Sequence, residues 1–164
     1  MLRRRGHEVP DRLPDGDFVA GTCLVVFSDD GSRVGIGVIR DIAKRMEEAR
    51  AHDAILVSAG LTSSASMEVR KHMSEGRFIV NMTPESLKFD LVDHVLVPPH
   101  RVLSAAEKRA LVETFGPESG LPQISLDDPV SKYYGVHPGD VFEITRNRPN
   151  VGEHPHYRVV VLNE

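Results

Sequence analysis

A stretch near the C-terminus, Asp127–Arg146 (DDPVSKYYGVHPGDVFEITR), constrains the fold more than any other part of the chain. Asp128-Pro129 predicts a helix start, because an Asp side chain accepts from free backbone amides and Pro needs no donor there. Gly135 predicts the end of that helix in the left-handed conformation. Pro138-Gly139 then fits a type II turn. The alternation of Val141–Arg146 predicts a strand directly after the turn.

The predicted short helix carries Val130, Tyr133 and Tyr134 at spacings that place them on one face. Adjacent tyrosines can stack on nucleic acid bases. Tyr is also a frequent core or interface anchor, because it buries a large area at low entropy cost. We therefore expect these tyrosines to pack or dock rather than to bind nucleic acid.

Composition favours a globular protein of one domain or two small ones. The 164 residues are 40% hydrophobic and 27% charged, which is ordinary for such a protein. The net charge of −4 argues against a free-standing nucleic-acid binder, although it leaves room for a small local contact. The single cysteine, Cys23, can form no internal disulfide or zinc pair, so a reducing compartment is expected.

Apolar runs and helical periodicity alternate in the first half of the chain. Residues 1–21, with prolines and glycines and no periodicity, are expected to form an irregular arm. Ser28–Arg33 is expected to be a turn. The β-α-β-α-β order predicts a parallel, right-handed sheet. The expected strands are Cys23–Phe27, Ala54–Val57 and Phe78–Met82, and the expected helices are Val34–Ala51 and one capped by Ser63 or Ser64 that runs to about Met73.

The second half mixes short strands with two helices. Ser104 and Glu107 have the spacing of a capping box, so a helix is expected from there to Phe115, with Gly116-Pro117 ending it. The other expected elements are a strand over Leu87–Leu91, an extended segment over Val97–His100, and a hairpin in which Val141–Arg146 pairs with Tyr157–Leu162 across a loop containing Pro149, Gly152 and Pro155.

No catalytic constellation is present in the sequence. None of the five lysines has an acidic residue two positions before it, which disfavours a metal-dependent nuclease site. The glycines of residues 34–37 lack the pattern of a phosphate-binding loop, and the eight histidines lack metal-binding spacing. No apolar run reaches the ~18 residues of a membrane span. We therefore expect no enzymatic activity, no metal or cofactor, no small-molecule ligand and no membrane contact.

Four blocks in the second half resemble one known family. DPVSKYYGVHPGDVFEITR is joined by HVLVPPHRVLS at residues 94–104 and LPQI at residues 121–124. Arg148-Pro149 and Tyr157-Arg158 form the last block. Together they resemble the fifth common subunit of eukaryotic nuclear DNA-directed RNA polymerases and its shorter archaeal counterpart. AILVSAGLTSSA at residues 54–65 resembles a further motif in the N-terminal part of that family.

The resemblance implies an α/β N-terminal jaw over residues 1–85, a small parallel or mixed sheet with helices, and an α+β assembly domain over residues 86–164. It also implies a non-catalytic structural subunit of a nuclear polymerase that docks on the largest subunit near the downstream DNA cleft. Localisation would then be nuclear, or nucleolar for a polymerase that transcribes rRNA genes. The resemblance implies assembly contacts for His94, Pro98, His100, Asp128, Pro129, Tyr133, Tyr134, Gly135, Arg146 and Arg158.

Thr62, Ser63 and Ser64 are the predicted DNA-contacting residues. They lie at a predicted helix start, where free amides and the helix dipole attract phosphate. Capping of the helix is the competing role for the same side chains. Any contact with downstream double-stranded DNA is expected to be weak and without sequence specificity.

Two departures from the family pattern concern the jaw. Ser63 stands where the family usually has Pro, and the sequence before Thr22 is too short for the segments with which the family's jaw opens. These departures suggest a divergent, short-jaw paralogue that serves one polymerase, or a virus-encoded homologue. Two other classes stay open: a free-standing α/β regulator that binds DNA or protein, and a hydrolase with an unrecognised site.

Overall fold

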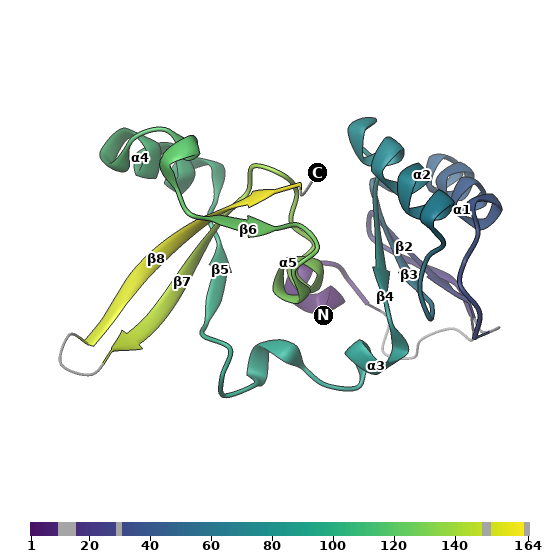
Figure 1. Cartoon of the computed structure of the whole chain (residues 1–164), viewed down its shortest axis with the longest axis horizontal. Helices are drawn as coiled ribbons and strands as arrows, with labels where there is room; N and C mark the ends of the chain where they lie inside the picture. The colour runs from purple at the N-terminus through teal and green to yellow at the C-terminus, as the bar shows by residue number, and fades with distance from the viewer. Residues whose placement is uncertain (10–15, 29–30, 149–151, 163–164) are drawn as a thin grey trace. The chain divides into compact units, whose positions relative to one another are not determined.

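The computed structural model describes residues 1–9, 16–28, 31–148 and 152–162, without the side chains of residues 147 and 148. Within it the chain divides into two compact units, Met1–Phe89 and Asp90–Glu164. Each unit contains its own four-stranded sheet with helices. The architecture is therefore of mixed α/β type in both parts of the chain (Figure 1).

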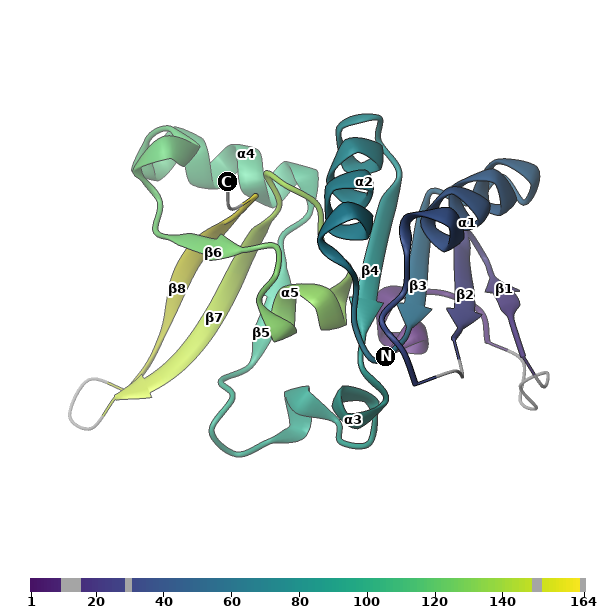
Figure 2. The ribbon, with the colours of Figure 1, turned by 45° about the vertical axis from the view of Figure 1, so that its right-hand side comes forward.

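The first unit is built on a sheet with strand order β1-β2-β3-β4 (Figure 2). The predicted parallel strands are confirmed: β2 (Cys23–Phe27), β3 (Asp53–Val57) and β4 (Phe78–Met82) run in the same direction. Their apolar residues are almost continuous, as expected of strands that are covered on both faces.

Two helices, α1 (Ile36–Glu48) and α2 (Ser63–Ser74), cover one face of this sheet. Both are close to the predicted ranges. The first begins later than expected because Val34 forms a parallel bridge with Leu61, which keeps it extended. The side chain that caps α2 belongs to Thr62, which accepts from the backbone amide of Ala65, so the prediction of Ser63 or Ser64 as the cap was wrong.

The expectation of an irregular arm before Thr22 was wrong for part of that segment; residues 10–15 lie outside the described part. Leu2–Arg5 forms a 3-10 helix, η1, and Phe18–Ala20 forms strand β1, antiparallel to β2. Met1, Leu2 and Phe18 pack on the sheet face opposite to the helices. That face also holds Cys23, where burial raises the pKa of the thiol to about 11. The thiol is therefore protonated and unreactive at neutral pH.

The strand predicted over Leu87–Leu91 is absent. Pro84–Leu87 instead forms a single helical turn, α3, and Leu91–Asp93 forms a 3-10 turn, η2. The Thr83 side chain accepts from the amide of Ser86, and that of Asp90 accepts from Val92. These caps satisfy backbone amides within the segment and so stabilise helical turns. The helical turns are therefore favoured over the strand that the alternation of apolar residues suggested.

The second unit has strand order β5-β7-β8-β6. Its strands are β5 (His100–Val102), β6 (Gln123–Ser125), β7 (Val141–Arg148) and β8 (Gly152–Val161). The hairpin β7–β8 is longer than predicted, because its pairing continues beyond Thr145 and Pro155 to Arg148 and Gly152. Gly152 and Pro155 therefore lie in a strand and not in the loop. The predicted turn residues 29–30 and loop residue Pro149 lie outside the described part.

Helix α4 (Ala105–Phe115) covers one face of this second sheet, over Val141 and Val159. The predicted capping box is confirmed. The Ser104 side chain accepts from the backbone amide of Glu107, and the Glu107 side chain accepts from the backbone amide of Ser104. A 3-10 turn, η3 (Glu118–Gly120), follows, and helix α5 (Pro129–Tyr134) lies on the other side of the sheet (Figure 1).

Candidate functional site: a protein-docking surface

Helix α5 has the ends that the sequence predicted. Asp128 Oδ1 accepts from the backbone amide of Val130 at 2.8 Å, and Pro129 occupies the first turn. Gly135 ends the helix in the left-handed conformation, at φ 65° and ψ 41°. The amide of Asp140 then donates to the carbonyl of His137 across Pro138-Gly139, which closes the predicted turn. These local bonds hold α5 as a short, defined platform.

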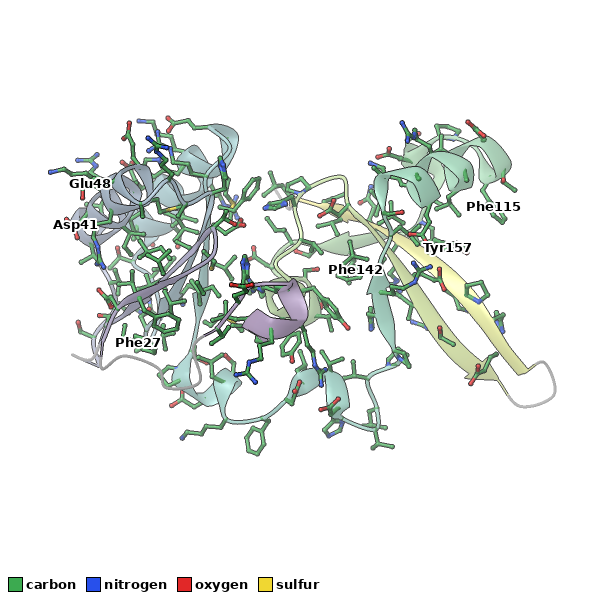
Figure 3. All side chains as sticks on the ribbon, turned by 180° about the vertical axis from the view of Figure 1, so that it is seen from behind. Phe27, Asp41, Glu48, Phe115, Phe142 and Tyr157 are labelled. Carbon is green, nitrogen blue, oxygen red and sulfur yellow. The ribbon has the colours of Figure 1, made fainter. Side chains whose placement is uncertain are left out.

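The aromatic side chains of α5 meet the sheet at Phe142, which is fully buried. The Tyr134 ring lies 5.6 Å from the Phe142 ring and 5.7 Å from that of Tyr133, both edge-on. His100, on β5, contacts Phe142 from the other side, with ring centres 5.5 Å apart. Edge-on pairs of this kind add to the stabilisation that burial provides. Phe142 is labelled in Figure 3.

Hydrogen bonds connect the same cluster to the proline segment before β5. The Tyr134 hydroxyl donates to the carbonyl oxygen of His100 at 2.8 Å. The Nδ1 atom of His100 lies 2.6 Å from the carbonyl oxygen of Pro98. Two sequence blocks that are distant in the chain, residues 94–104 and 128–146, thus meet here. Sequence reasoning missed Phe142 as the central residue, and its only signal was an apolar position in an alternating strand.

Several of the predicted assembly residues act electrostatically on His100. Burial lowers the pKa of its imidazole, and this effect outweighs the bond to Pro98, which raises it. The Asp128 carboxylate raises that pKa, whereas the Arg146 and Arg158 guanidinium groups lower it. The His100 ring is therefore neutral at pH 7. A guanidinium nitrogen of Arg158 also lies 3.4 Å from the carbonyl oxygen of Gln123, at the outer limit of a hydrogen bond.

A groove of about 620 Å³ adjoins this cluster. Two of its residues, Val95 and Leu96, are 92% and 82% exposed, although they are large and apolar. Sequence reasoning missed both, and their signal was an apolar run in a segment without helical or strand periodicity. Exposed apolar residues gathered beside a hollow are typical of protein interfaces. The groove is lined by Val95, Leu96, Val97, Pro98, Pro99, Thr145, Arg146 and Glu153.

His94 stands outside the aromatic cluster and has a local role. Its Nδ1 atom accepts from the backbone amide of Leu96 at 3.2 Å, which fixes the turn that presents the exposed residues. Most of the predicted assembly residues thus lie in or close to the cluster around His100, and of these only Pro98 and Arg146 also line the groove.

The predicted DNA-contacting residues lie at a different place, in the first unit. The bridge between Val34 and Leu61 brings the N-termini of α1 and α2 close together. Neither helix has an acidic residue in its first turn, so no side chain there neutralises the positive end of the dipole. Ser63 and Ser64 are exposed at this edge, while Thr62 is half-buried as the cap.

Within the described part of the chain, no three His, Cys, Asp or Glu side chains gather closely enough to hold a metal ion. No helix there is both long and apolar enough to cross a membrane.

Comparisons with known proteins identify the family. The family described as RNA polymerase Rpb5, C-terminal domain, matches residues 89–160. A Caenorhabditis elegans protein named DNA-directed RNA polymerases I, II, and III subunit RPABC1 is 32% identical over 84% of this chain, which spans 66% of that protein's length. A Dictyostelium discoideum protein of the same name is 31% identical over 84% of this chain and 72% of its own length.

An archaeal relative is shorter and more similar. The protein named DNA-directed RNA polymerase subunit Rpo5 from Pyrococcus abyssi is 48% identical over 75 residues, which are 45% of this chain and 92% of that protein. The match thus covers nearly all of the archaeal polymerase subunit, and that subunit is about as long as the second unit of this chain. The chain therefore belongs to the Rpb5 family, a family of accessory rather than catalytic RNA polymerase subunits.

Proposed function

We propose that this chain is a non-catalytic structural subunit of a nuclear DNA-directed RNA polymerase. In this proposal the second unit docks on the largest subunit, close to the downstream DNA, and the first unit lies beside that DNA. The observation that carries the proposal is the archaeal match, in which a protein named as a polymerase subunit is covered over 92% of its length. The names of the eukaryotic relatives support a nuclear protein. Its location would be nucleolar if it serves the polymerase that transcribes rRNA genes.

The docking surface proposed for the largest subunit is the groove beside the aromatic cluster. Its two exposed apolar residues, Val95 and Leu96, would gain burial from a partner, at roughly 25 cal/mol for each Å² of apolar area removed from water. The cluster of His100, Tyr134 and Phe142 holds the adjacent backbone in place. The buried residues of the site therefore position the groove, and the exposed ones make the contact.

Co-purification of the largest subunit with a tagged chain tests this division of roles. Leu96→Asp should abolish co-purification without unfolding the chain, because the side chain is exposed. Met67→Asp is the matched control, since Met67 is 66% exposed on α2 in the first unit, and it should assemble normally. Assembly of Leu96→Asp at the level of the control would exclude the groove as the docking surface.

Three further variants separate the roles of the two units. Tyr134→Ala should reduce assembly, because loss of a packed aromatic side chain costs about 3 kcal/mol and disturbs the platform. Tyr134→Phe keeps the ring and loses the hydroxyl's bond to His100, a cost of about 1 kcal/mol, so it should assemble. Ser63→Ala should leave assembly intact and at most weaken a DNA contact. Loss of assembly with Ser63→Ala but not with Tyr134→Ala would mean that the roles of the units are reversed.

Binding of the isolated protein to duplex DNA distinguishes the subunit from a free-standing regulator. The net charge of −4 does not favour the six to ten phosphate contacts that give tight binding, so weak, non-specific affinity is expected. Fluorescence anisotropy with a labelled duplex of random sequence at physiological salt measures it. Sub-micromolar affinity would favour the regulator.

A further inference from the structure

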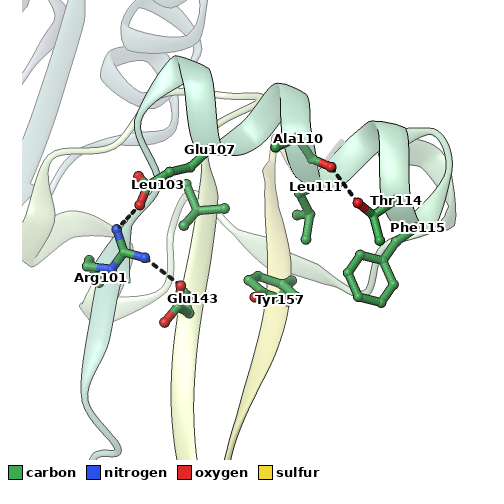
Figure 4. Close-up of a pocket in the computed structure, with 9 residues that line it drawn as sticks. All are labelled: Arg101, Leu103, Glu107, Ala110, Leu111, Thr114, Phe115, Glu143 and Tyr157. Carbon is green, nitrogen blue, oxygen red and sulfur yellow. Dashed lines mark hydrogen bonds and ion pairs between the residues drawn. The ribbon is translucent and has the colours of Figure 1, made fainter.

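A second hollow, of about 320 Å³, opens between α4 and the hairpin β7–β8. It lies on the sheet face opposite to the aromatic cluster, because Glu143 and Tyr157 alternate along their strands with Phe142 and Arg158. Its volume is in the range of pockets that hold a side chain or small group. Figure 4 shows its lining: Arg101, Leu103, Glu107, Ala110, Leu111, Thr114, Phe115, Glu143 and Tyr157.

One end of this α4 hollow is apolar and exposed. Phe115 lies in the last turn of α4 and is 69% exposed. Its ring centre is 6.1 Å from that of the half-buried Tyr157, and both rings border the hollow (Figures 3 and 4). Leu111 is buried in the adjoining core and closes the floor. A large exposed aromatic side chain above an apolar floor is typical of the anchoring part of a protein interface.

The other end is acidic. Arg101 donates to Glu107 Oε1 and to Glu143 Oε2, each at 2.6 Å. The Ser104 backbone amide and then Arg101 lower the pKa of Glu107 to about 2, so its carboxylate is ionised at neutral pH. Two carboxylates and one guanidinium leave this cluster with a net negative charge. Glu143 bonds Arg101 through Oε2, which leaves Oε1 of this hollow-lining side chain to accept a bond from a partner.

The helix itself adds to this negative potential. The last turn of α4, which contains Thr114 and Phe115, has no basic residue. The negative end of the helix dipole is therefore not neutralised by a side chain of that turn. The carboxylates and the end of α4 thus give the hollow a negative potential, and the one guanidinium in its lining, that of Arg101, is already bonded to two carboxylates. An acidic peptide or a nucleic acid phosphate would therefore be repelled.

We propose that the α4 hollow docks a segment of a partner protein that inserts an apolar side chain beside Phe115 and brings an Arg or Lys side chain to Glu143. The apolar side chain contributes buried area. The basic side chain sets the orientation of the segment, because a charge-assisted bond to Glu143 fixes the segment's position along the hollow. This site is separate from the groove, so the segment can be bound while the second unit is assembled on another protein. The proposal does not depend on the polymerase role.

Selection from a random peptide library displayed on phage tests the proposal with the full chain. Peptides are selected on the unmodified chain and counter-selected on Phe115→Ser, whose substitution leaves the buried core intact. Enriched peptides should combine a large apolar residue with Arg or Lys a few positions away. Enrichment of acidic peptides, or equal retention on Phe115→Ser, would overturn the proposal. Phe89→Ser, at a position that is 79% exposed in the first unit, is the matched control and should retain the selected peptides.

The strongest selected peptide then tests the charge contact. Its affinity for Glu143→Gln should fall at least tenfold, while a version of the peptide with Gln in place of the basic residue should bind both chains equally weakly. A loss that is the same for both peptides would show that Glu143 does not contact the basic residue.

Light scattering of the free chain tests self-association. A dimer that dissociates when Phe115 is replaced in Phe115→Ser would assign the hollow to a second copy of the chain instead.

Discussion

His100 contacts three other parts of the second unit. Its carbonyl oxygen accepts from Tyr134 on α5, its ring packs edge-on against Phe142 on β7, and its Nδ1 atom contacts the carbonyl of Pro98. The sequence predicted His100 through a motif, whereas the contacts explain why a histidine can be held there. Its ring is apolar enough to pack against Phe142. Its Nδ1 atom bonds the carbonyl of Pro98, in a segment where the prolines have no backbone N–H to donate.

The first prediction concerns acid sensitivity. Burial lowers the folded-state pKa of His100 below the ordinary value of about 6.5, so the unfolded chain binds the proton more readily. The free energy of unfolding should be fully retained above pH ~6.5 and should decrease as the pH falls through that value toward the lower folded pKa. Urea unfolding between pH 7.5 and pH 5, followed by tyrosine fluorescence, measures this change.

The same fluorescence reports on the second unit alone, because all three tyrosines (133, 134 and 157) lie in it. In His100→Gln, the decrease in the free energy of unfolding between pH 7.5 and pH 5 should be smaller than in the parent chain. His52→Gln, in the first unit, should leave the decrease unchanged. An equal decrease in all three chains would contradict a role for His100.

At the scale of elements, α5 shows how local chemistry fixes a short helix. Asp128 supplies the cap, Pro129 fits the first turn, and Gly135 supplies the left-handed end. The isolated six-residue helix would not be stable in water, so packing of Tyr133 and Tyr134 must supply the remainder. The ends of α5 were therefore predictable, but its position on the sheet was not.

The second prediction tests the C-terminal end of α5. Gly135→Val should lower the free energy of unfolding by about 1–2 kcal/mol, because a β-branched residue resists the positive φ of this position. Gly135→Asn should cost less, because Asn tolerates the left-handed conformation better. Urea unfolding followed by tyrosine fluorescence compares the two variants. Equal destabilisation by Val and Asn would mean that the side chain's volume, and not its backbone preference, sets the cost.

At the scale of the whole molecule, each of the two units has a core of its own. The first unit has apolar clusters on both faces of its sheet, and the second has a cluster under α4 as well as Phe142, Ile144 and Val160 on the other face. Every strand of each sheet comes from the same unit. Separate cores and complete sheets are the properties expected of independently folding domains.

The third prediction follows from these separate cores. A fragment of residues 90–164 should unfold cooperatively on heating, with a tyrosine fluorescence transition close to that of the full chain. Circular dichroism of the fragment should show the same transition as its fluorescence, as expected of a two-state domain. A fragment without a cooperative transition, beside a full chain that has one, would show that the second unit depends on the first.

The sequence by itself determined the elements whose ends are set by nearby residues. The capping box of Ser104, the turn at Pro138-Gly139 and the parallel strands of the first unit were predicted correctly, because caps, turn residues and apolar runs act within a few positions. The family was predicted for the same reason, since its motifs are short blocks with fixed spacing. Two local predictions were wrong. At Leu87–Leu91, caps were stronger than an alternation that had been interpreted as a strand, and at α2 the cap is Thr62 and not Ser63 or Ser64.

Only the tertiary structure decided which residues meet. Strands β1 and β6 contain three residues each and carry little periodic signal, and they form because longer strands offer them an edge to pair with. The cluster around Phe142 and the α4 hollow likewise combine residues from separate elements. Such contacts depend on how the sheet is ordered and which face each helix covers, and a local pattern in the chain cannot specify either.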